Sequence, residues 1–253
     1  MSYRALNLPA DKHVFLGRRG GVSQGRYASL NVRDRSSDDP RAVAENRRIA
    51  VGKLGMNPRQ LVMLRQMSAT DAVLVEQASQ GVVEADGMVC KVPGLVLGIG
   101  TADCLPVLLA DYEHGVIGAA HAGWRGAVRG VVENTLKLML AQGAVLEEIS
   151  AALGPCIQQS SFEVGADVRD ECTAVLPAYA AFFAPGKDAG HFQFDLEGLV
   201  RRRLEQFGVR NITASGIDTY ADEENYFSFR RDTHRGLTGS GSDFGGHVSL
   251  ITL

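Results

Sequence analysis

The stretch IGTADCLPVLLADYEHGVIGAAHAGWRGAVRG, residues 99–130, is the part of the chain from which a fold can be predicted most directly. It contains two short apolar runs, 105–110 and 115–121, with the polar segment DYEH between them. Apolar runs of this length without alternation are typical of strands that are covered on both faces. The thiol of Cys104 comes just before the first run, and the imidazole of His121 ends the second. The stretch therefore predicts two buried strands with one reactive side chain near an end of each.

Outside this stretch, further short apolar runs alternate with longer amphipathic segments. We expect strands at 12–17, 61–67, 72–76, 94–99, 149–155, 211–217 and 246–253. We expect helices at 126–142, 165–176 and 195–207, and one that opens at Pro40 after an Asp38 or Asp39 cap and ends near Gly55. Turn-rich loops are expected at 18–39, 181–191 and 235–246. No repeat or break in composition marks a boundary, so the sequence predicts a single α/β domain over residues 1–253.

The composition restricts the class of protein. A chain of 253 residues with 45% hydrophobic and 22% charged residues is typical of a soluble globular domain. The net charge of −3 and the isoelectric point near 6.1 argue against electrostatic binding of nucleic acid. Several arginines nevertheless lie in groups, which leaves room for a small anionic ligand; these groups are 47–48, 201–203 and 230–231.

The sequence also bears on where the protein works. No N-terminal segment resembles a secretory signal, and no apolar run is long enough to cross a membrane. The four cysteines, at positions 90, 104, 156 and 172, form no C-x-x-C pair, which fits free thiols in a reducing compartment. We therefore expect a cytoplasmic protein without a membrane partner, and the sequence indicates no protein partner.

Cys104 and His121 each have a structural and a functional interpretation. A free cysteine is usually a small buried hydrophobic residue, but Thr101 and Asp103 beside Cys104 bring three polar groups to one bend. A lone histidine is usually structural, but His121 opens the segment HAGWRG at a strand-to-helix turn that suits an anion. Together the two side chains could form half of a zinc site or a thiol–imidazole nucleophilic pair, and their spacing does not separate these readings.

Eight motifs, in order along the chain, resemble those of one known family. They are GVSxGxYxSLN (21–31), DDPxxVxxNR (38–47), ADG (85–87), TADCLPVLLAD (101–111), AHAGWRG (120–126), LGPCI (153–157), FEVG (162–165) and FSFRRD (227–232). By these motifs the chain resembles the YfiH family. Its members are also called laccase-domain proteins, polyphenol oxidases or, more recently, purine nucleoside phosphorylases. The resemblance spans almost the whole chain, and it implies one α/β domain with layered mixed sheets and helices outside.

The resemblance also implies an activity and a metal. The activity is phosphorolysis of adenosine, inosine and methylthioadenosine, with deamination of adenosine alongside. The metal is zinc, held by a histidine and by residues that match Cys104 and His121 here. The third ligand does not match, because the family reads QVHGxDxV where this chain reads QMSATDAV, which places Ser68 at the position of the ligand histidine. Serine is a poor zinc ligand, so we expect a weakened zinc site.

Three outcomes for this site stay open. Another histidine could supply the missing ligand; those without an assigned place are His13, His191, His234 and His247. The site could hold a metal weakly, with Asp103 assisting. It could instead be empty, with Cys104 and His121 left as a dyad.

Phosphorolysis needs groups that bind phosphate and that offset charge on the leaving base. We expect phosphate to be bound by Arg125 at the strand-to-helix turn, by Arg47 with its neighbour Asn46, or by Arg230. Phe227 and Phe229 on alternate positions would place Arg230 on a strand face. Deamination instead needs an activated water, as in the zinc deaminases, with an acid/base carboxylate. Asp103 is the candidate for that carboxylate, and Ser68 is expected to damage this activity most.

The resemblance therefore implies an enzyme, a purine nucleoside phosphorylase with nucleoside and phosphate as its small-molecule partners. Three other classes of function compete with it. The chain could be an impaired family member that binds nucleosides without turnover, or a cysteine hydrolase with a Cys104–His121 dyad. It could also be a copper-dependent polyphenol oxidase, although one cysteine and one histidine are a poor copper set.

Overall fold

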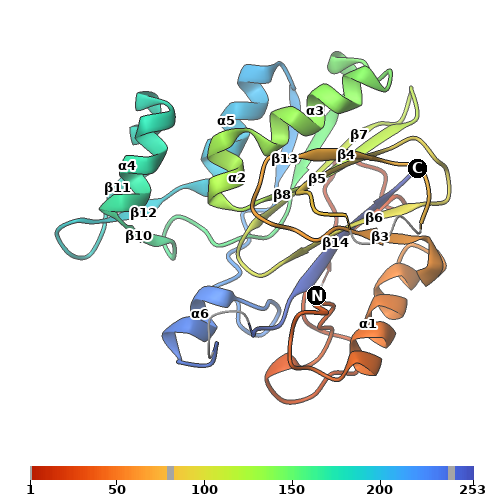
Figure 1. Cartoon of the computed structure of the whole chain (residues 1–253), viewed down its shortest axis with the longest axis horizontal. Coiled ribbons are helices and arrows are strands. Elements are labelled where there is room, and N and C mark those ends of the chain that lie inside the picture. The colour runs from red at the N-terminus through yellow and green to blue at the C-terminus, as the bar shows by residue number, and fades with distance from the viewer. Residues whose placement is uncertain (1, 79–82, 239–242) are drawn as a thin grey trace.

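The computed structural model describes residues 2–78, 83–238 and 243–253, which form three β-sheets with helices around them (Figure 1). The largest sheet has the strand order β13-β9-β7-β8-β5-β4, the second β1-β2-β14-β6-β3, and the smallest β10-β12-β11. The strands of the largest sheet are Ala72–Val75 (β4), Gly87–Cys90 (β5), Leu105–Asp111 (β7), Val116–Ala122 (β8), Ser150–Leu153 (β9) and Asn211–Ala214 (β13). Those of the second are Ser2–Tyr3 (β1), His13–Leu16 (β2), Leu61–Met63 (β3), Val96–Thr101 (β6) and His247–Thr252 (β14).

The two predicted central strands are confirmed. Every residue of β7 and β8 is buried, and the two strands pair antiparallel with Pro106 opposite His121. Because both are almost continuously apolar, each can pack on both faces of its sheet. The register places the start of β7, which follows Cys104, beside the end of β8, which carries His121.

The core consists of three layers of buried apolar side chains. Between the two large sheets, Phe15, Ile99 and Ile251 of the second sheet pack against Leu108 and Ile117 of the first. The outer face of the first sheet is covered by α3 (Val131–Ala141) and α5 (Leu196–Phe207), and that of the second by α1 (Pro40–Gly52). The predicted mixed α/β domain with layered sheets and outer helices is confirmed.

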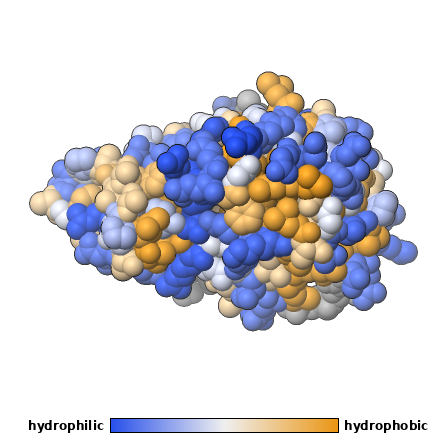
Figure 2. Space-filling model, turned by 90° about the horizontal axis from the view of Figure 1, so that it is seen from above, coloured by the Kyte–Doolittle hydropathy of each residue, from blue (hydrophilic) through white to orange (hydrophobic). Residues whose placement is uncertain are grey.

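The third sheet, of β10 (Glu163–Gly165), β11 (Phe183–Pro185) and β12 (His191–Phe194), lies with α4 (Ala166–Val175) at one end of the molecule (Figure 1). Viewed from above, the molecule narrows toward this end, and polar side chains surround the apolar patches of that face (Figure 2). The remaining helices are α2 (Trp124–Arg129), α6 (Phe229–His234) and the short 3-10 helices Gly25–Tyr27, Pro58–Gln60, Leu146–Glu148 and Pro177–Phe182. No helix of the described residues is long and apolar enough to cross a membrane.

Three helices follow their sequence signals closely. The side chain of Asp39 caps α1 by accepting from the Arg41 amide, although α1 ends at Gly52, before the expected Gly55. The side chain of Asp195 caps α5, and Gly208 ends it in the left-handed conformation with φ of 114°. The predicted helix at 165–176 is α4.

Several other expectations are wrong. The helix predicted over 126–142 is two helices, because Gly130 adopts φ of 107° between α2 and α3. The strand predicted over 61–67 ends at Met63, and the loop predicted over 181–191 contains β11 and the start of β12. Arg230 lies on helix α6 and not on a strand, because Ser228 caps a helix there. Part of the predicted loop 235–246 lies outside the described residues.

Candidate active site between two clefts

Ser68, Cys104 and His121 converge on one point at the end of the large sheet. The position that a Cβ atom of residue 123 would occupy lies 3.3 Å from the Ser68 Oγ, 3.3 Å from the Cys104 Sγ and 3.5 Å from the His121 Cε1. Residue 123 is glycine, so this space is left open between the three side chains. The predicted proximity of Cys104 and His121 is confirmed, and Ser68 joins them.

The buried carboxylate of Asp86 orders this group. It accepts hydrogen bonds from the backbone amides of Met67 (3.0 Å), Ser68 (3.0 Å) and Ala69 (2.8 Å), which fixes the Ser68 backbone at a φ of 59°. It also lies 2.7 Å from the Nδ1 of His121. With Nδ1 engaged, Nε2 is the ring nitrogen left for a ligand. Asp86 belongs to the ADG motif, but the motif alone does not predict that Asp86 orients His121 and the backbone of Ser68.

The protonation of His121 responds to these neighbours. Burial lowers the pKa of His121, but the nearby Cys104 and the hydrogen bond to Asp86 raise it more, to about 10. Burial alone would raise the pKa of Asp86, yet the His121 ring and the backbone amides bring it below its usual value. Both shifts favour the charged forms, so Asp86 and His121 form a buried ion pair.

The donor set does not fit a zinc site with three protein ligands. Within the described residues, no three histidine, cysteine, aspartate or glutamate side chains are grouped so that they could hold a metal. Cys104 and His121 supply two donors of the right chemistry, and the third side chain is the hydroxyl of Ser68. The same set is a poor one for copper.

The four candidate histidines do not replace the missing ligand. His13 is bound to the Ala5 amide (2.8 Å) and the Pro9 carbonyl (2.9 Å). His247 is buried between the rings of Tyr226 and Phe227. His191 and His234 are exposed and line a different cleft from the one that contains Ser68 and His121.

One cleft beside the convergence point is rich in arginine. It has a volume of about 520 Å³, and we call it the arginine cleft. Ser68, Cys104 and His121 line it together with four arginines: Arg33, Arg35, Arg47 and Arg65. The acidic residue among its lining is Asp34. Guanidinium groups in this number make the cleft suitable for an anion such as phosphate.

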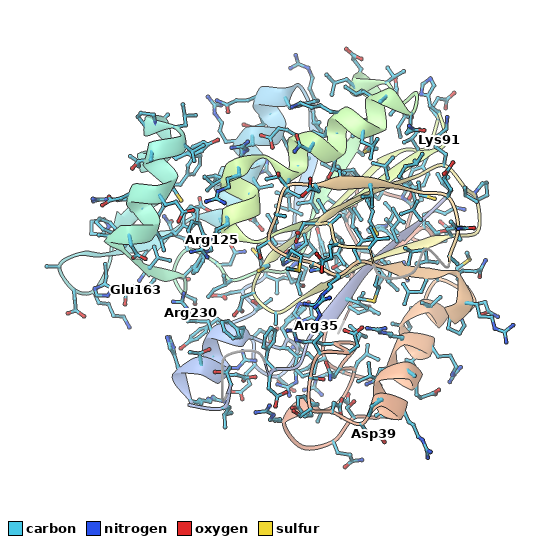
Figure 3. The ribbon with its side chains drawn as sticks, viewed as in Figure 1. Arg35, Asp39, Lys91, Arg125, Glu163 and Arg230 are labelled. Carbon is cyan, nitrogen blue, oxygen red and sulfur yellow. The ribbon has the colours of Figure 1, made fainter. Side chains whose placement is uncertain are left out.

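The four arginines differ in what holds them. Arg47 donates to the Val32 carbonyl (2.9 Å) and pairs with Asp34 at 3.1 Å, and Arg65 lies 3.3 Å from Glu84. Arg33 lies over the ring of Phe244, 3.9 Å from its centroid. Burial and then the charge of Arg35 lower the pKa of Arg33, so a bound anion would relieve the repulsion between these two cations. Arg35 is exposed and extends beside the large sheets (Figure 3).

A second cleft, of about 590 Å³, lies on the other side of Cys104. We call it the aromatic cleft, because Trp124, Phe162 and Phe229 line it along with Arg230. Ala102 and Cys104 line both clefts, so the two adjoin at the bend that contains the TADC motif.

Asp103 faces away from the convergence point. Its Oδ1 accepts from the Thr219 hydroxyl (2.8 Å), and its Oδ2 accepts from the Ser228 hydroxyl (2.9 Å) and the Arg230 amide (2.7 Å). Burial raises the pKa of Asp103, and these three donors oppose the rise. Both oxygens are committed, so the structure does not support Asp103 as an acid/base group or as an assisting metal ligand. It joins the TADC bend to the start of α6.

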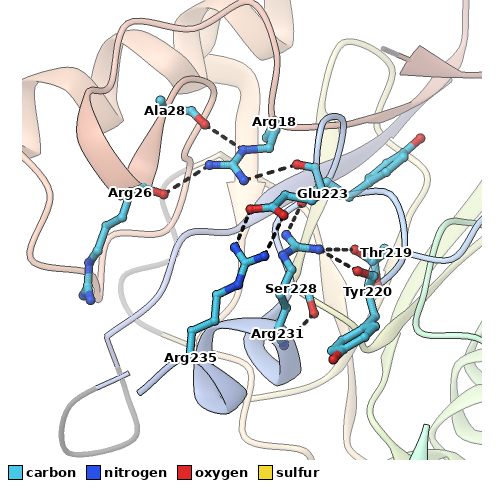
Figure 4. A network of polar contacts seen from close by, with 10 residues as sticks. Arg18, Arg26, Ala28, Thr219, Tyr220, Glu223, Ser228, Arg231 and Arg235 are labelled. Atoms are coloured by element: carbon cyan, nitrogen blue, oxygen red, sulfur yellow. Dashed lines mark hydrogen bonds and ion pairs between the residues drawn. The ribbon is translucent and has the colours of Figure 1, made fainter. Parts of the chain in front are cut away.

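The partners of Asp103 are held by a second network (Figure 4). Arg231 is buried and donates to the carbonyls of Thr219 (2.8 Å), Tyr220 (2.9 Å) and Tyr226 (2.7 Å). Arg18 donates to the Ala28 carbonyl (2.7 Å) beside it. These contacts stabilise the segment that positions Thr219 and the first turn of α6, and therefore Arg230.

Two predicted phosphate ligands lie outside both clefts. Arg125 is exposed on α2, where it covers the Trp124 ring (4.1 Å to the centroid) and approaches Glu171 at 3.9 Å (Figure 3). Asn46 is buried, and its side chain bonds the Val22 amide (2.8 Å) and the Asn31 carbonyl (2.8 Å). Asn46 therefore attaches the 21–31 loop to α1, and it is Arg47, one position later, that reaches the arginine cleft.

A sequence model described as "Multi-copper polyphenol oxidoreductase laccase" matches residues 12–251. The chain belongs to this laccase-like family. A "Purine nucleoside phosphorylase" of Deinococcus radiodurans is 43% identical over 242 residues, which are 93% of this chain and 88% of the relative. "Purine nucleoside phosphorylase PA4543" of Pseudomonas aeruginosa is 37% identical over 87% of each chain.

Solved structures of the laccase-like family have the same fold. Protein NMB0706 of Neisseria meningitidis is 36% identical, with a TM-score of 0.87 over 100% of this chain and 98% of that one. The hypothetical protein YfiH of Bacillus licheniformis is 26% identical, with a TM-score of 0.86 over 95% of this chain and 92% of that one. The resemblance to YfiH proteins seen in the motifs is confirmed.

Proposed function

We propose that this protein is a purine nucleoside phosphorylase that acts on adenosine, inosine and methylthioadenosine. The observation that carries the proposal is that the arginine cleft and the aromatic cleft adjoin at Ala102 and Cys104. Phosphorolysis places the entering phosphate and the leaving purine on opposite sides of C1′ of the ribose. A phosphate site and a planar, apolar site on either side of one point are what this reaction needs. The names of the relatives support the same activity.

In this arrangement each cleft has one task. Arg33, Arg35 and Arg47 bind phosphate and bring its oxygen to C1′, where the phosphate charge also offsets the positive charge that develops on the ribose. Trp124 and Phe162 contact the faces of the purine, with Arg230 at its edge. The C1′–O bond forms as the C1′–N9 bond breaks, and the purine takes up a proton from solvent. Cys104, where the two clefts adjoin, and His121, beside it in the arginine cleft, position the ribose.

We assign Asp103 and Asp86 to positioning. Asp103 holds the backbone of Arg230, and Asp86 holds the ring of His121. Since the donor set does not fit a three-ligand metal site, no part of this scheme depends on zinc. Because the four cysteines are free, we propose a reducing compartment, the cytoplasm, as the site of action.

The test is release of ribose 1-phosphate and base from each nucleoside in the presence of phosphate. We expect Arg35→Met to raise the KM for phosphate about ten-fold, because the variant loses a charge-assisted hydrogen bond to phosphate. We expect little change in stability, because the Arg35 side chain is exposed. Arg59→Met, an exposed arginine on a 3-10 helix away from both clefts, is the matched control.

Two results would contradict the proposal. Nucleoside binding without any base release would identify an impaired, binding-only family member. An unchanged phosphate KM in Arg35→Met would show that phosphate does not enter the arginine cleft. Oxygen uptake with a phenol after loading with copper would instead support the polyphenol oxidase that the family description names.

One geometric feature favours a second candidate function, a cysteine hydrolase. Asp86 orients His121, and the Cys104 sulfur interacts with the same ring, which is the order of contacts in a nucleophile–base–acid triad. Ester hydrolysis that is lost in Cys104→Ser, together with a trapped acyl group on Cys104 by mass spectrometry, would support this activity.

A further inference from the structure

Arg230 presents hydrogen-bond donors to the aromatic cleft. Its backbone amide is bound to the Oδ2 of Asp103 at 2.7 Å, which fixes its place on α6 beside the bend of Cys104. Its guanidinium reaches toward the third sheet (Figure 3), where one Nη1 proton is donated to the Glu163 carbonyl, and it lies 5.3 Å from the centroid of the Phe162 ring. The guanidinium is therefore held at two points against an aromatic wall.

Most of the donors of Arg230 are left for a ligand. A guanidinium has five N–H groups and no acceptor. In the described parts of the chain, Arg230 forms no ion pair, and the Glu163 carbonyl is its side-chain hydrogen-bond partner. The Glu163 carboxylate is turned away, because it accepts from the Lys187 amide (2.8 Å). A partly buried cation of this kind favours a ligand edge made of acceptors.

The edges of the purines differ in this respect. A 6-oxopurine presents two adjacent acceptors, O6 and N7, which match the two parallel N–H groups of a guanidinium. A 6-aminopurine presents the N7 acceptor beside an N6 amino donor, and two donors cannot pair. The Phe162 ring beside Arg230 offers a flat surface on which the same base can stack.

Resting on the proposed function, we propose that Arg230 reads the O6/N7 edge of the base and makes 6-oxopurine nucleosides, such as inosine and guanosine, the preferred substrates over adenosine and methylthioadenosine. The same contact serves the reaction. As the bond from C1′ to N9 breaks, the purine ring becomes negatively charged, and a cation at N7 and O6 stabilises that charge. Arg230 is thus a specificity residue that also acts on the leaving group.

The kinetic experiment compares kcat/KM for inosine and adenosine in the wild type, Arg230→Gln and Arg230→Met. We expect the wild type to prefer inosine by about ten-fold to one hundred-fold, the range of a bidentate base contact. Arg230→Met should lose the preference. Arg230→Gln should reverse it, because an amide can accept from N6 and donate to N7. Arg202→Met, on the exposed face of α5, is the matched control.

A binding experiment separates this inference from the proposed function. Trp124 is the single tryptophan of the chain and lines the aromatic cleft, so its fluorescence reports a base bound there without turnover. We expect hypoxanthine to bind more tightly than adenine, and Arg230→Gln to reverse the order. If no nucleoside is cleaved but this order is found, the proposed activity fails and the assignment of Arg230 stands.

The assignment of Arg230 is overturned by equal affinities for hypoxanthine and adenine in the wild type, or by the same inosine-to-adenosine ratio in all three proteins. Thermal unfolding of each variant is measured alongside. If a variant does not fold, the wild-type affinities alone decide, since they need no substitution.

Discussion

At the scale of single residues, Ser68 is the position at which this chain lacks the third ligand of a zinc site. The surroundings of such a site are present, because Asp86 holds the backbone of residues 67–69 and also orients the ring of His121. Cys104, His121 and Ser68 already face one open space. What is missing is a third donor of suitable chemistry.

Ser68→His is therefore expected to create a tight zinc site without changing the fold. The purified variant should retain about one zinc ion per chain, measured by elemental mass spectrometry after gel filtration, because it completes a set of three protein ligands. The wild type and Ser68→Ala, the matched control, should retain much less. Equal zinc in all three proteins would contradict this expectation.

The same variant tests the expected damage to deamination. In the absence of phosphate, Ser68→His should convert adenosine to inosine faster than the wild type, because a metal-activated water is the nucleophile in zinc deaminases. The readout is inosine measured by chromatography. Equal rates for the two proteins would refute the link between Ser68 and deamination.

The residues show what a sequence can and cannot predict at this scale. Cys104 and His121 could be placed together because Cys104 directly precedes one recognisable strand and His121 lies at the end of the next. Asp103 could not be placed correctly, since the three donors that turn it away lie more than one hundred residues later in the chain. Arg35 was missed because nothing in a polar loop shows which of its arginines faces a cleft.

At the scale of elements, the break between α2 and α3 sets the position of Trp124. The apolar pattern continues across Gly130, through Val128, Val131 and Val132, so the sequence alone predicts one helix. The left-handed conformation of Gly130 divides it, and α2 then lies so that Trp124 faces the aromatic cleft. The sequence does not predict the hairpin of β11 and β12, because the Gly and Pro residues of its turn favour a loop over 181–191.

Gly130→Ala is expected to destabilise the protein by about 1–2 kcal/mol, because alanine is strained at a φ of 107°. An added Cβ would also lie 3.3 Å from the Nη2 of Arg203. Urea unfolding measures the change. Gly52→Ala, at an open position at the end of α1 without a positive φ, is the control and should have no such cost. Equal stability of Gly130→Ala and the wild type would show that this break is not strained.

At the scale of the whole molecule, the interior determines how the protein responds to acid. His247 lies on β14, the middle strand of the second large sheet, with both ring nitrogens buried. Burial, and then the charges of Arg18 and Arg231, lower its pKa from 6.5 to about 3. The rings of Tyr226 and Phe227 are its other neighbours. The folded protein therefore keeps His247 neutral at pH values where the unfolded chain protonates it.

Stability should fall as the pH is lowered from about 6.5 toward 3, with a contribution from His247 of up to about 1.4 kcal/mol per pH unit. Above pH 6.5 the contribution is constant, because the residue is neutral in both states. Urea unfolding at a series of pH values measures the slope. His247→Gln should have a shallower slope between pH 6 and 4, whatever its stability at pH 7. An unchanged slope would show that His247 does not control this response.

Much of the overall architecture could be predicted from the strand and helix patterns, and the motifs indicated a layered domain. The pairing of the strands could not. β14 lies between β2 and β6, although residues 13–16 and 96–101 are far from residues 247–252 in the chain. Local patterns contain no information about partners at such separations.

The central place of β14 has a consequence during synthesis on the ribosome. β2 and β6 are made early, yet the strand that joins them is translated long after both. Until then, each exposes an unpaired edge of backbone groups that can pair with another nascent chain. The growing polypeptide is thus open to misassembly for most of its translation, and binding by a chaperone in that interval would protect it.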